Sequence, residues 1–334
     1  MTTVNTQCRL AERPTDILTA SNWAIVDEPK PVASEGQLVV QVDYLSIDPA
    51  MRTWMNAGRS YVPPVEIGEV MRALGVGRVV ESRHPRFAVG DDVSGIFGVQ
   101  RYALSDGAEV NKIDTALAPA PVYLSALGIS GLTAYFGLLD IGKPEPGQTV
   151  LVSGAAGSVG SVVGQIAKIK GCRAIGIAGG EEKRRWLIEE AGFDAAIDYK
   201  AADLRKELKS HAPDGVDVYF DNVGGATLEA ALNRLAFGAR IVLCGAVSQY
   251  NDTPRGPANY MQLLVSRASM TGFVIFDYAK RYPEAVAQLA KWLASGELRS
   301  HEQVEHGGVA DFPDTLAKLF RGENTGKLIL GLGE

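Results

Sequence analysis

Three glycines at a regular spacing, Gly154, Gly157 and Gly160, directly follow a short apolar run, Thr149–Val152. Apolar residues then recur at helical spacing over 159–167, so the pattern predicts a buried strand, a glycine turn and a helix. In that context the glycines let the backbone approach a pyrophosphate, and the helix N-terminus offers N–H donors to the anion. The pattern indicates dinucleotide binding; the alternative is a tight turn without a ligand.

The residues after the next predicted strand bear on which nucleotide is bound. A site for NAD has an acidic residue about 20 residues past the turn, on the ribose 2′-hydroxyl. Here that place reads Ala178–Gly180, and Lys183 follows within one helical turn. A cation attracts a 2′-phosphate that an acid would repel, which favours NADPH over NADH. The alternative is that Lys183 and Arg184 are solvated helix charges, and Glu181 and Glu182 support it.

Two later strand ends carry polar residues that could face the nicotinamide ribose. Asn222 and two glycines follow the fourth predicted strand, and the segment Cys244–Asn251, which contains Tyr250, follows the fifth. Ligands of doubly wound sheets lie beyond the carboxyl ends of the strands. Either segment is equally compatible with an ordinary turn between strand and helix.

Length and composition restrict the class of protein. The chain has 334 residues, which predicts two domains, and it is 46% hydrophobic and 22% charged, as in soluble globular enzymes. The net charge of −6, with no block of five like charges, disfavours a nucleic-acid partner. The three cysteines form no CxxC pair, and their odd number favours a reducing compartment, most simply the cytoplasm. We expect no membrane span and no signal peptide.

The predicted elements change in type along the chain. Residues 2–104 read as a small β-rich domain, in which Asp48 and Pro49 open a turn and Asp48 is expected to cap a short helix. From residue 125 onward strands and helices alternate, which predicts a parallel, doubly wound sheet. The strands are expected at 149–152, 173–177, 195–197, 216–220, 241–243 and 272–276, and the helices at 125–139, 181–191, 203–210, 227–236 and 282–294.

His301 and His306 superficially resemble a zinc-binding pair. A zinc-binding helix needs histidines four residues apart, and five residues turn them roughly 140° from each other. We therefore expect a strand or loop here and no metal site.

Several segments stand in the order found in one family. These are Asp48–Arg52, Gly131–Tyr135, Ala155–Ser161, Phe220–Gly225, Ser248–Asn251 and Gly322–Lys327. Together they resemble the zinc-independent medium-chain dehydrogenases/reductases, in the group of prostaglandin reductases, leukotriene B4 12-hydroxydehydrogenases, alkenal double-bond reductases and bacterial NADPH-dependent curcumin reductases. The resemblance covers nearly the whole chain.

This resemblance implies an α/β protein with a GroES-like catalytic domain at 1–124 and 299–334 and an inserted Rossmann domain at 125–298. It also implies NADPH as cofactor, no metal, and a homodimer. The glycine turn would hold the pyrophosphate, and Lys183 with Tyr199 would hold the 2′-phosphate. The cofactor-binding residues it implies are Gly157, Ser158, Val159, Gly160, Lys183, Tyr199, Asn222, Cys244, Gly245, Ser248, Tyr250, Phe273, Val274, Ile275 and Asn324.

Two positions depart from the family pattern. Ala50 stands where a tyrosine is usual, and Ser130 stands where a proline is usual. We expect both differences to affect the substrate pocket.

The function expected from the sequence is NADPH-dependent reduction of the C=C bond of an α,β-unsaturated ketone or aldehyde. Without a metal, hydrogen-bond donors must stabilise the enolate, and Tyr250 and the ribose 2′-hydroxyl are the candidates. Tyr250 or water would then protonate the α-carbon; an equally open role for Tyr250 is to pack against the ribose only. The alternatives are quinone reduction on the same scaffold and a crystallin-like protein that binds NADPH without turnover.

Overall fold

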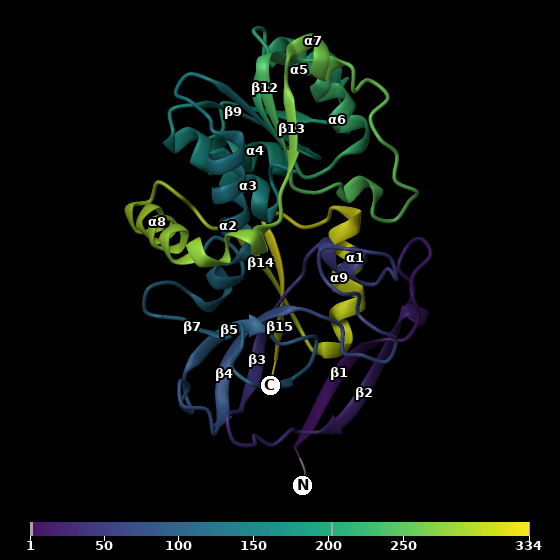
Figure 1. Ribbon diagram of the computed structural model, residues 1–334, viewed down its shortest axis with the longest axis vertical. Helices are drawn as coiled ribbons and strands as arrows, with labels where there is room; N and C mark the ends of the chain where they lie inside the picture. Colours follow the sequence, from purple (N-terminus) through teal and green to yellow (C-terminus); the bar gives the residue numbers. More distant parts are fainter. Residues whose placement is uncertain (1–2, 202, 334) are drawn as a thin grey trace. The chain divides into compact units, whose positions relative to one another are not determined.

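The structure of the protein is a computed structural model that describes residues 3–201 and 203–333. It divides into two compact units (Figure 1): the first runs as far as Leu124 and resumes at Glu302, and the second spans Ser125–His301. The sequence placed the return to the first unit at residue 299. The return falls instead at Glu302, where the strand β14 begins.

The first unit is built on a seven-stranded sheet in which β15 and β3 lie side by side and antiparallel. The strand order is β14-β15-β3-β4-β5-β7, and β6 pairs with β3. Its strands are β3 (Leu38–Ser46), β4 (Leu74–Ser82), β5 (Asp92–Ile96), β6 (Tyr102–Ser105), β7 (Asn111–Lys112), β14 (Glu302–Gly307) and β15 (Lys327–Leu332). The helices are α1 (Ala50–Trp54) and α9 (Phe312–Arg321). All residues of β15 are buried, as expected for a strand in the middle of a sheet.

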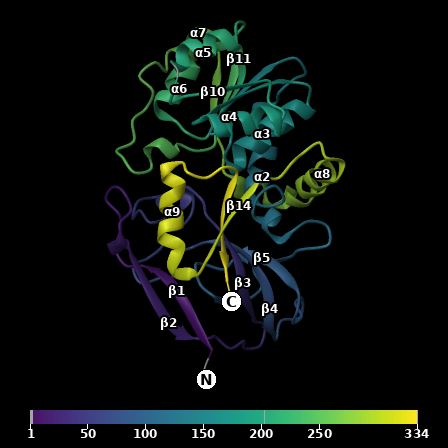
Figure 2. The same cartoon turned by 180° about the vertical axis from the view of Figure 1, so that it is seen from behind.

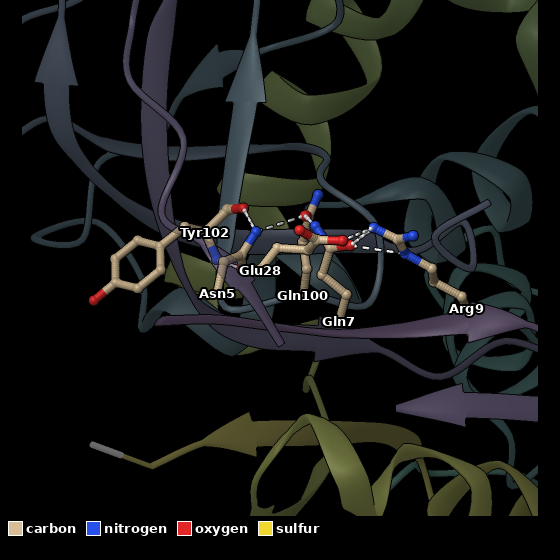
Figure 3. A network of polar contacts seen from close by, with 6 residues as sticks. All are labelled: Asn5, Gln7, Arg9, Glu28, Gln100 and Tyr102. Carbon is tan, nitrogen blue, oxygen red and sulfur yellow. Dashed lines mark hydrogen bonds and ion pairs between the residues drawn. The ribbon is translucent and has the colours of Figure 1, made fainter. Parts of the chain in front are cut away.

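The first unit also contains a separate two-stranded sheet, β1 (Val4–Leu10) with β2 (Trp23–Pro29). Hydrogen bonds between buried side-chain amides connect it to the rest of the unit (Figure 3). The Gln100 Oε1 atom accepts hydrogen bonds from Asn5 Nδ2 (3.2 Å) and from Gln7 Nε2 (3.0 Å). Asn5 and Gln7 are only 2% and 9% exposed, so each amide needs a protein partner. Arg9 extends the network by donating to Gln7 Oε1 and pairing with Glu28.

The second unit is a six-stranded parallel sheet with the strand order β10-β9-β8-β11-β12-β13. Its strands are β8 (Thr149–Ser153), β9 (Arg173–Ala178), β10 (Ala195–Asp198), β11 (Val216–Asp221), β12 (Leu235–Leu243) and β13 (Ser269–Gly272). Its helices are α2 (Ile129–Phe136), α3 (Ser158–Ile169), α4 (Glu181–Glu189), α5 (Leu204–His211), α6 (Gly225–Leu232), α7 (Gln262–Ser266) and α8 (Tyr282–Ser295). The order reverses between β8 and β11, which makes the carboxyl ends of these two strands the topological switch point of a Rossmann fold. Figures 1 and 2 show this unit from two opposite sides.

The strand predicted over 272–276 is wrong in its position. The observed strand β13 is Ser269–Gly272, and a 3₁₀ helix begins at Ile275. The reason is the neighbouring strand, since β12 ends at Leu243, opposite Gly272, and offers no backbone partner beyond it. An apolar run alone did not reveal where the hydrogen-bonded ladder stops.

Two predicted helices also have the wrong bounds. The helix predicted over 227–236 is α6, which begins at Gly225 and ends at Leu232, and β12 already begins at Leu235. The guanidinium of Arg234 donates to the carbonyl of Ala212 (2.8 Å) and holds the turn between helix and strand. The helix predicted over 125–139 is α2 followed by a π-helical turn, Gly137–Gly142.

In the described parts of the chain, no helix is long and apolar enough to cross a bilayer.

Candidate cofactor and active site

The glycine turn connects β8 to α3 and is shaped for a close approach of backbone to ligand. Gly154 has φ +57°, a conformation that favours glycine, and a Cβ on Gly160 would lie 2.4 Å from the carbonyl oxygen of Gly154. The N-cap of α3 is Gly157, which has no side chain to accept hydrogen bonds from the first amides of the helix. The amides of Ser158, Val159 and Gly160 are therefore placed to bind an anion.

The sequence indicated Lys183 near the end of β9, and the structure adds a second cation, Lys200. A Cβ on Gly179 would lie 2.9 Å from the side chains of both Lys200 and Tyr199, so glycine lets them come close. Burial, and next the charge of Lys200, lowers the pKa of Lys183. Such a group favours an anion as partner, because a negative charge opposes both effects.

The neighbouring charges of α4 have partners within the protein. Arg184 pairs with Glu181 (2.7 Å) and donates to the carbonyl of Ala196 (3.1 Å). Arg184 is thus held by the protein, and the acid at Glu181 is compensated. Lys200 lies beside Tyr199, which is half exposed, and its charge acts on Lys183.

The carboxylate of Asp221, at the end of β11, organises the turn that follows. Its Oδ1 atom accepts hydrogen bonds from Ser153 Oγ (2.8 Å), Tyr219 Oη (2.7 Å) and the amides of Val223 and Gly224 (both 3.0 Å). Asp221 and Tyr219 are fully buried. Burial, followed by the charge of Asp221, raises the pKa of Tyr219 well above its usual value, which keeps this phenol a donor.

Asn222 is fixed by the same contacts. Its amide nitrogen donates to Ser153 Oγ (2.9 Å) and its side-chain Nδ2 donates to the carbonyl of Ser153 (2.7 Å). A Cβ on Gly154 would lie 3.5 Å from the Cβ of Asn222. The predicted residue Asn222 therefore lies beside the glycine turn, on the strand pair that flanks the switch point.

The segment after β12 is tied to the same strand end. The amides of Cys244 and Gly245 donate to the carbonyl of Asp221 (2.9 and 3.1 Å). Burial raises the pKa of the Cys244 thiol to about 12, so it stays protonated and is not a nucleophile at neutral pH. The Tyr250 hydroxyl accepts a hydrogen bond from the amide of Ala246 (3.2 Å).

A cavity of about 350 Å³ lies at these strand ends within the second unit. Asp221 contributes to its lining, and its second oxygen, Oδ2, is buried without a hydrogen-bond partner among the described residues. Tyr250 supplies the hydroxyl group of the lining. The lining residues are Asp221, Gly224, Gly225, Leu228, Leu243, Cys244, Gly245, Ala246, Gln249, Tyr250 and Arg255.

Other predicted cofactor-binding residues of the second unit do not line this cavity, namely Ser248, Phe273, Val274 and Ile275. Ser248 Oγ donates to the carbonyl of Val223 (2.6 Å), which joins the two segments after β11 and β12. The ring of Phe273 meets that of Phe220 edge to face, 6.5 Å between centroids. Val274 precedes the 3₁₀ helix that begins at Ile275, and Ile275 is 8% exposed.

Asn324 belongs to the first unit, where its Nδ2 donates to the carbonyl of Gly326 (3.0 Å). Nearby in the same unit, the buried ammonium of Lys327 pairs with Asp48 and donates to the carbonyl of Ile47 (3.2 Å). Ser46 also donates to the Asp48 carboxylate. The expectation that Asp48 caps a helix is wrong, because Pro49 is the N-cap of α1 and the Asp48 side chain is held by Lys327 instead.

The two histidines considered for a metal are used differently. The His301 ring stacks on that of Trp186, 4.7 Å between centroids, and His306 lies on β14. Within the ranges 3–201 and 203–333, no group of three or more histidine, cysteine or acidic residues is arranged to hold a metal ion.

The residues of the second unit fit NADPH. The first amides of α3 have no side-chain cap, so they can donate to a diphosphate. Gly160 has no Cβ to block the close packing of the turn. Lys183 and Lys200 would hold a 2′-phosphate by charge, and Ala178–Gly180, where an NAD site has its acid, contain no acidic residue.

Sequence reasoning missed Ser153 and Asp221 as residues that shape the site. Both are polar residues at the last position of an otherwise apolar strand, and that position was the available signal. Their partnership depends on β8 and β11 being neighbours, although 68 positions separate the two residues.

Comparison with known proteins agrees with this architecture. A family model described as the N-terminal domain of oxidoreductase matches residues 6–113, and one described as zinc-binding dehydrogenase matches residues 158–292. The chain belongs to the medium-chain dehydrogenase/reductase family. Within it, the chain is 40% identical to the NADPH-dependent curcumin reductase of Escherichia coli (96% of this chain, 95% of the relative). It is 39% identical to the NADP-dependent 2-alkenal reductase of Nicotiana tabacum (88% and 86%).

A solved structure gives the same fold with a cofactor. The crystal structure of CurA from Vibrio vulnificus in complex with NADPH matches with a TM-score of 0.93 at 43% identity, over 98% of this chain and 99% of that one. The predicted family and the α/β fold with a Rossmann unit are thereby confirmed, and the chain is an oxidoreductase.

Proposed function

We propose that this oxidoreductase uses NADPH to reduce the C=C bond of α,β-unsaturated ketones or aldehydes. The observation that carries the cofactor assignment is the pair of cations Lys183 and Lys200, which act on each other by charge, in place of the acid of an NAD site. The relatives named as NADPH-dependent curcumin reductase and NADP-dependent 2-alkenal reductase support the reaction class.

NADPH, when bound, supplies the hydride for the β-carbon of the substrate. The residues of the chain then have to stabilise the negative charge that develops on the substrate carbonyl oxygen. The Tyr250 hydroxyl is our candidate for this donor and for the acid that protonates the α-carbon, with water as the alternative acid. The Ala246 amide, which donates to the phenolic oxygen, orients the hydroxyl and stabilises charge on it when its proton leaves.

The contacts of Asp221 set the geometry of this site. The Asp221 side chain fixes the turn 222–224, and its carbonyl fixes Cys244 and Gly245. Groups held in this way do not have to reorganise during the reaction, which is the main source of electrostatic catalysis.

The deciding experiment is a substrate panel with the purified chain. NADPH oxidation is measured with a 2-alkenal, an aryl enone and a quinone, and the products are identified by mass spectrometry. Saturated ketones or aldehydes support the proposal. An unsaturated alcohol, turnover of the quinone alone, or NADPH binding without any turnover would each contradict it, and the last two correspond to a quinone reductase and to a crystallin-like protein.

We also propose a cytoplasmic homodimer. The outer strand β13 pairs with β12 on one side, and Ser269, Thr271 and Gly272 are exposed along it. Exposed apolar side chains, Phe237 (80%) and Leu264 (67%), lie on the neighbouring β12 and α7. A second copy could extend the sheet at this edge and cover these side chains. Light scattering that gives the mass of a monomer at micromolar concentration would contradict the dimer.

A further inference from the structure

The first turns of α2 and α3 are joined by a contact between two serine hydroxyls. Ser158 Oγ donates to Ser130 Oγ at 2.5 Å, at the short end of the range for hydroxyl hydrogen bonds. Ser130 is only 5% exposed, so its hydroxyl depends on protein partners. Ser130 is one of the two departures from the family pattern that we expected to affect the substrate pocket, and its hydroxyl also contacts the residue that directly follows Gly157.

Ser158 is the residue through which this contact can act on a ligand. It is the first residue of α3, directly after Gly157, which provides no side-chain cap. A serine hydroxyl has one donor and two acceptor positions, and without a partner it rotates between orientations. Ser130 removes that freedom, because a hydroxyl at 2.5 Å fixes the direction of one of these positions.

We propose that Ser130 is a positioning residue for the cofactor diphosphate, which it serves by holding the Ser158 side chain where its oxygen meets the anion. This inference rests on the proposed use of NADPH. In the structure Ser158 donates to Ser130. When a diphosphate binds, Ser158 turns its proton to a diphosphate oxygen and accepts a hydrogen bond from Ser130 instead, because each hydroxyl can accept one hydrogen bond while it donates another. Donation to a charged acceptor is stronger than donation between neutral groups, so binding favours this direction.

The alternative is that the contact only ties α2 to α3. These helices pack against each other, and a second buried serine of α3, Ser161, is available as a matched control. Its hydroxyl faces the carbonyl of Ser158 at 3.5 Å and makes no contact with Ser130 in the described structure. Removing this hydroxyl tests the cost of losing a buried serine hydroxyl on the same helix.

The experiment measures binding directly, by calorimetric titration of the purified chain with NADPH and with adenosine 2′-monophosphate. The second ligand carries the 2′-phosphate and lacks the diphosphate. We expect Ser130→Ala to weaken NADPH binding about three- to tenfold, as for losing one hydrogen bond. Ser158→Ala should have a similar effect, and the double variant should bind no more weakly than Ser158→Ala alone. Binding of adenosine 2′-monophosphate should stay within about twofold in all variants, as should both affinities in Ser161→Ala.

Three results would overturn the inference. The first is NADPH binding by Ser130→Ala at the wild-type affinity. The second is an equal loss of affinity for both ligands, which would indicate a loosened fold. The third is additive losses in the double variant, which would show that Ser130 does not act through Ser158. A wild-type chain that binds NADPH but reduces no enone would contradict the proposed reaction and leave this inference standing, and one that binds no NADPH would overturn both.

Discussion

Ser153 donates a hydrogen bond to Asp221 across neighbouring strands, with 2.8 Å between the hydroxyl and the carboxylate and both residues fully buried. The same carboxylate oxygen accepts three further hydrogen bonds, and through them it holds the turn that contains Asn222. The core of the second unit and the candidate cofactor site thus share one acceptor.

We expect Asp221→Ala to lower the free energy of unfolding by about 2–4 kcal/mol, because buried donors lose their acceptor. Asp221→Asn should lose less, since the amide oxygen can accept the same hydrogen bonds. Urea unfolding of both variants, with NADPH affinity measured alongside, checks this. Similar losses in the two variants would mean that the charge, and not the acceptor, is what the fold requires.

Lys183→Ala should weaken NADPH binding roughly ten- to a hundredfold and leave NADH binding nearly unchanged, because a charged contact to the 2′-phosphate is lost. The control is Lys209→Ala, at an exposed position on α5. Equal losses for the two cofactors would contradict a role of Lys183 at the 2′-phosphate.

The same lysine predicts a pH dependence. Burial lowers the pKa of Lys183, so its charged form is present below that pKa and is lost as the pH rises through it. The preference for NADPH over NADH should therefore decline on the alkaline side, at a lower pH than an ordinary lysine would give. Affinity ratios across the pH range should show this decline in the wild type and not in Lys183→Ala.

Tyr250→Phe keeps the ring and removes the hydroxyl. If the hydroxyl stabilises the enolate, kcat should fall about a hundred- to a thousandfold, as for the loss of one oxyanion donor. NADPH affinity should then hardly change, and Tyr260→Phe, at an exposed tyrosine, should behave like the wild type. Weaker cofactor binding with normal saturated turnover would instead assign Tyr250 to packing against the ribose.

Gln100→Ala tests the buried amide network of the first unit. Asn5 and Gln7 would lose their shared acceptor, so we expect a loss of about 1–3 kcal/mol in the free energy of unfolding. The exposed amide of Asn111, on β7 of the same unit, provides a control whose replacement by alanine should change stability by less than about 0.5 kcal/mol. An unchanged midpoint for Gln100→Ala in thermal unfolding would show that water replaces Gln100.

The local parts of the second unit were predictable from the sequence. Gly154, Gly157 and Gly160 stand within one turn, and the strand and helix around them follow from periodicity alone. The missing acid after β9 was equally visible, because its position is counted along the chain from the glycine turn.

The parts that could not be predicted depend on distant partners. The extent of β13 is set by where β12 ends, and the role of Asp221 is set by Ser153 on a strand that is not adjacent in sequence. The contact of Ser130 with Ser158 joins residues 28 positions apart, which no local pattern reveals. The local sequence suggested that Asp48 caps a helix. Its actual partner, Lys327, could not be predicted because it lies 279 positions away.

The position of β15 between β14 and β3 has a consequence for how the protein is made. A ribosome releases β3 early, but the strand that must pair with it leaves only after the whole segment Ser125–His301. Because domains fold as units during synthesis, the second unit can complete its sheet while the first still has an open edge at β3. Nascent chains arrested before Lys327 should therefore contain a folded second unit and an incomplete first unit. The unpaired edge of β3 should make these chains prone to aggregation.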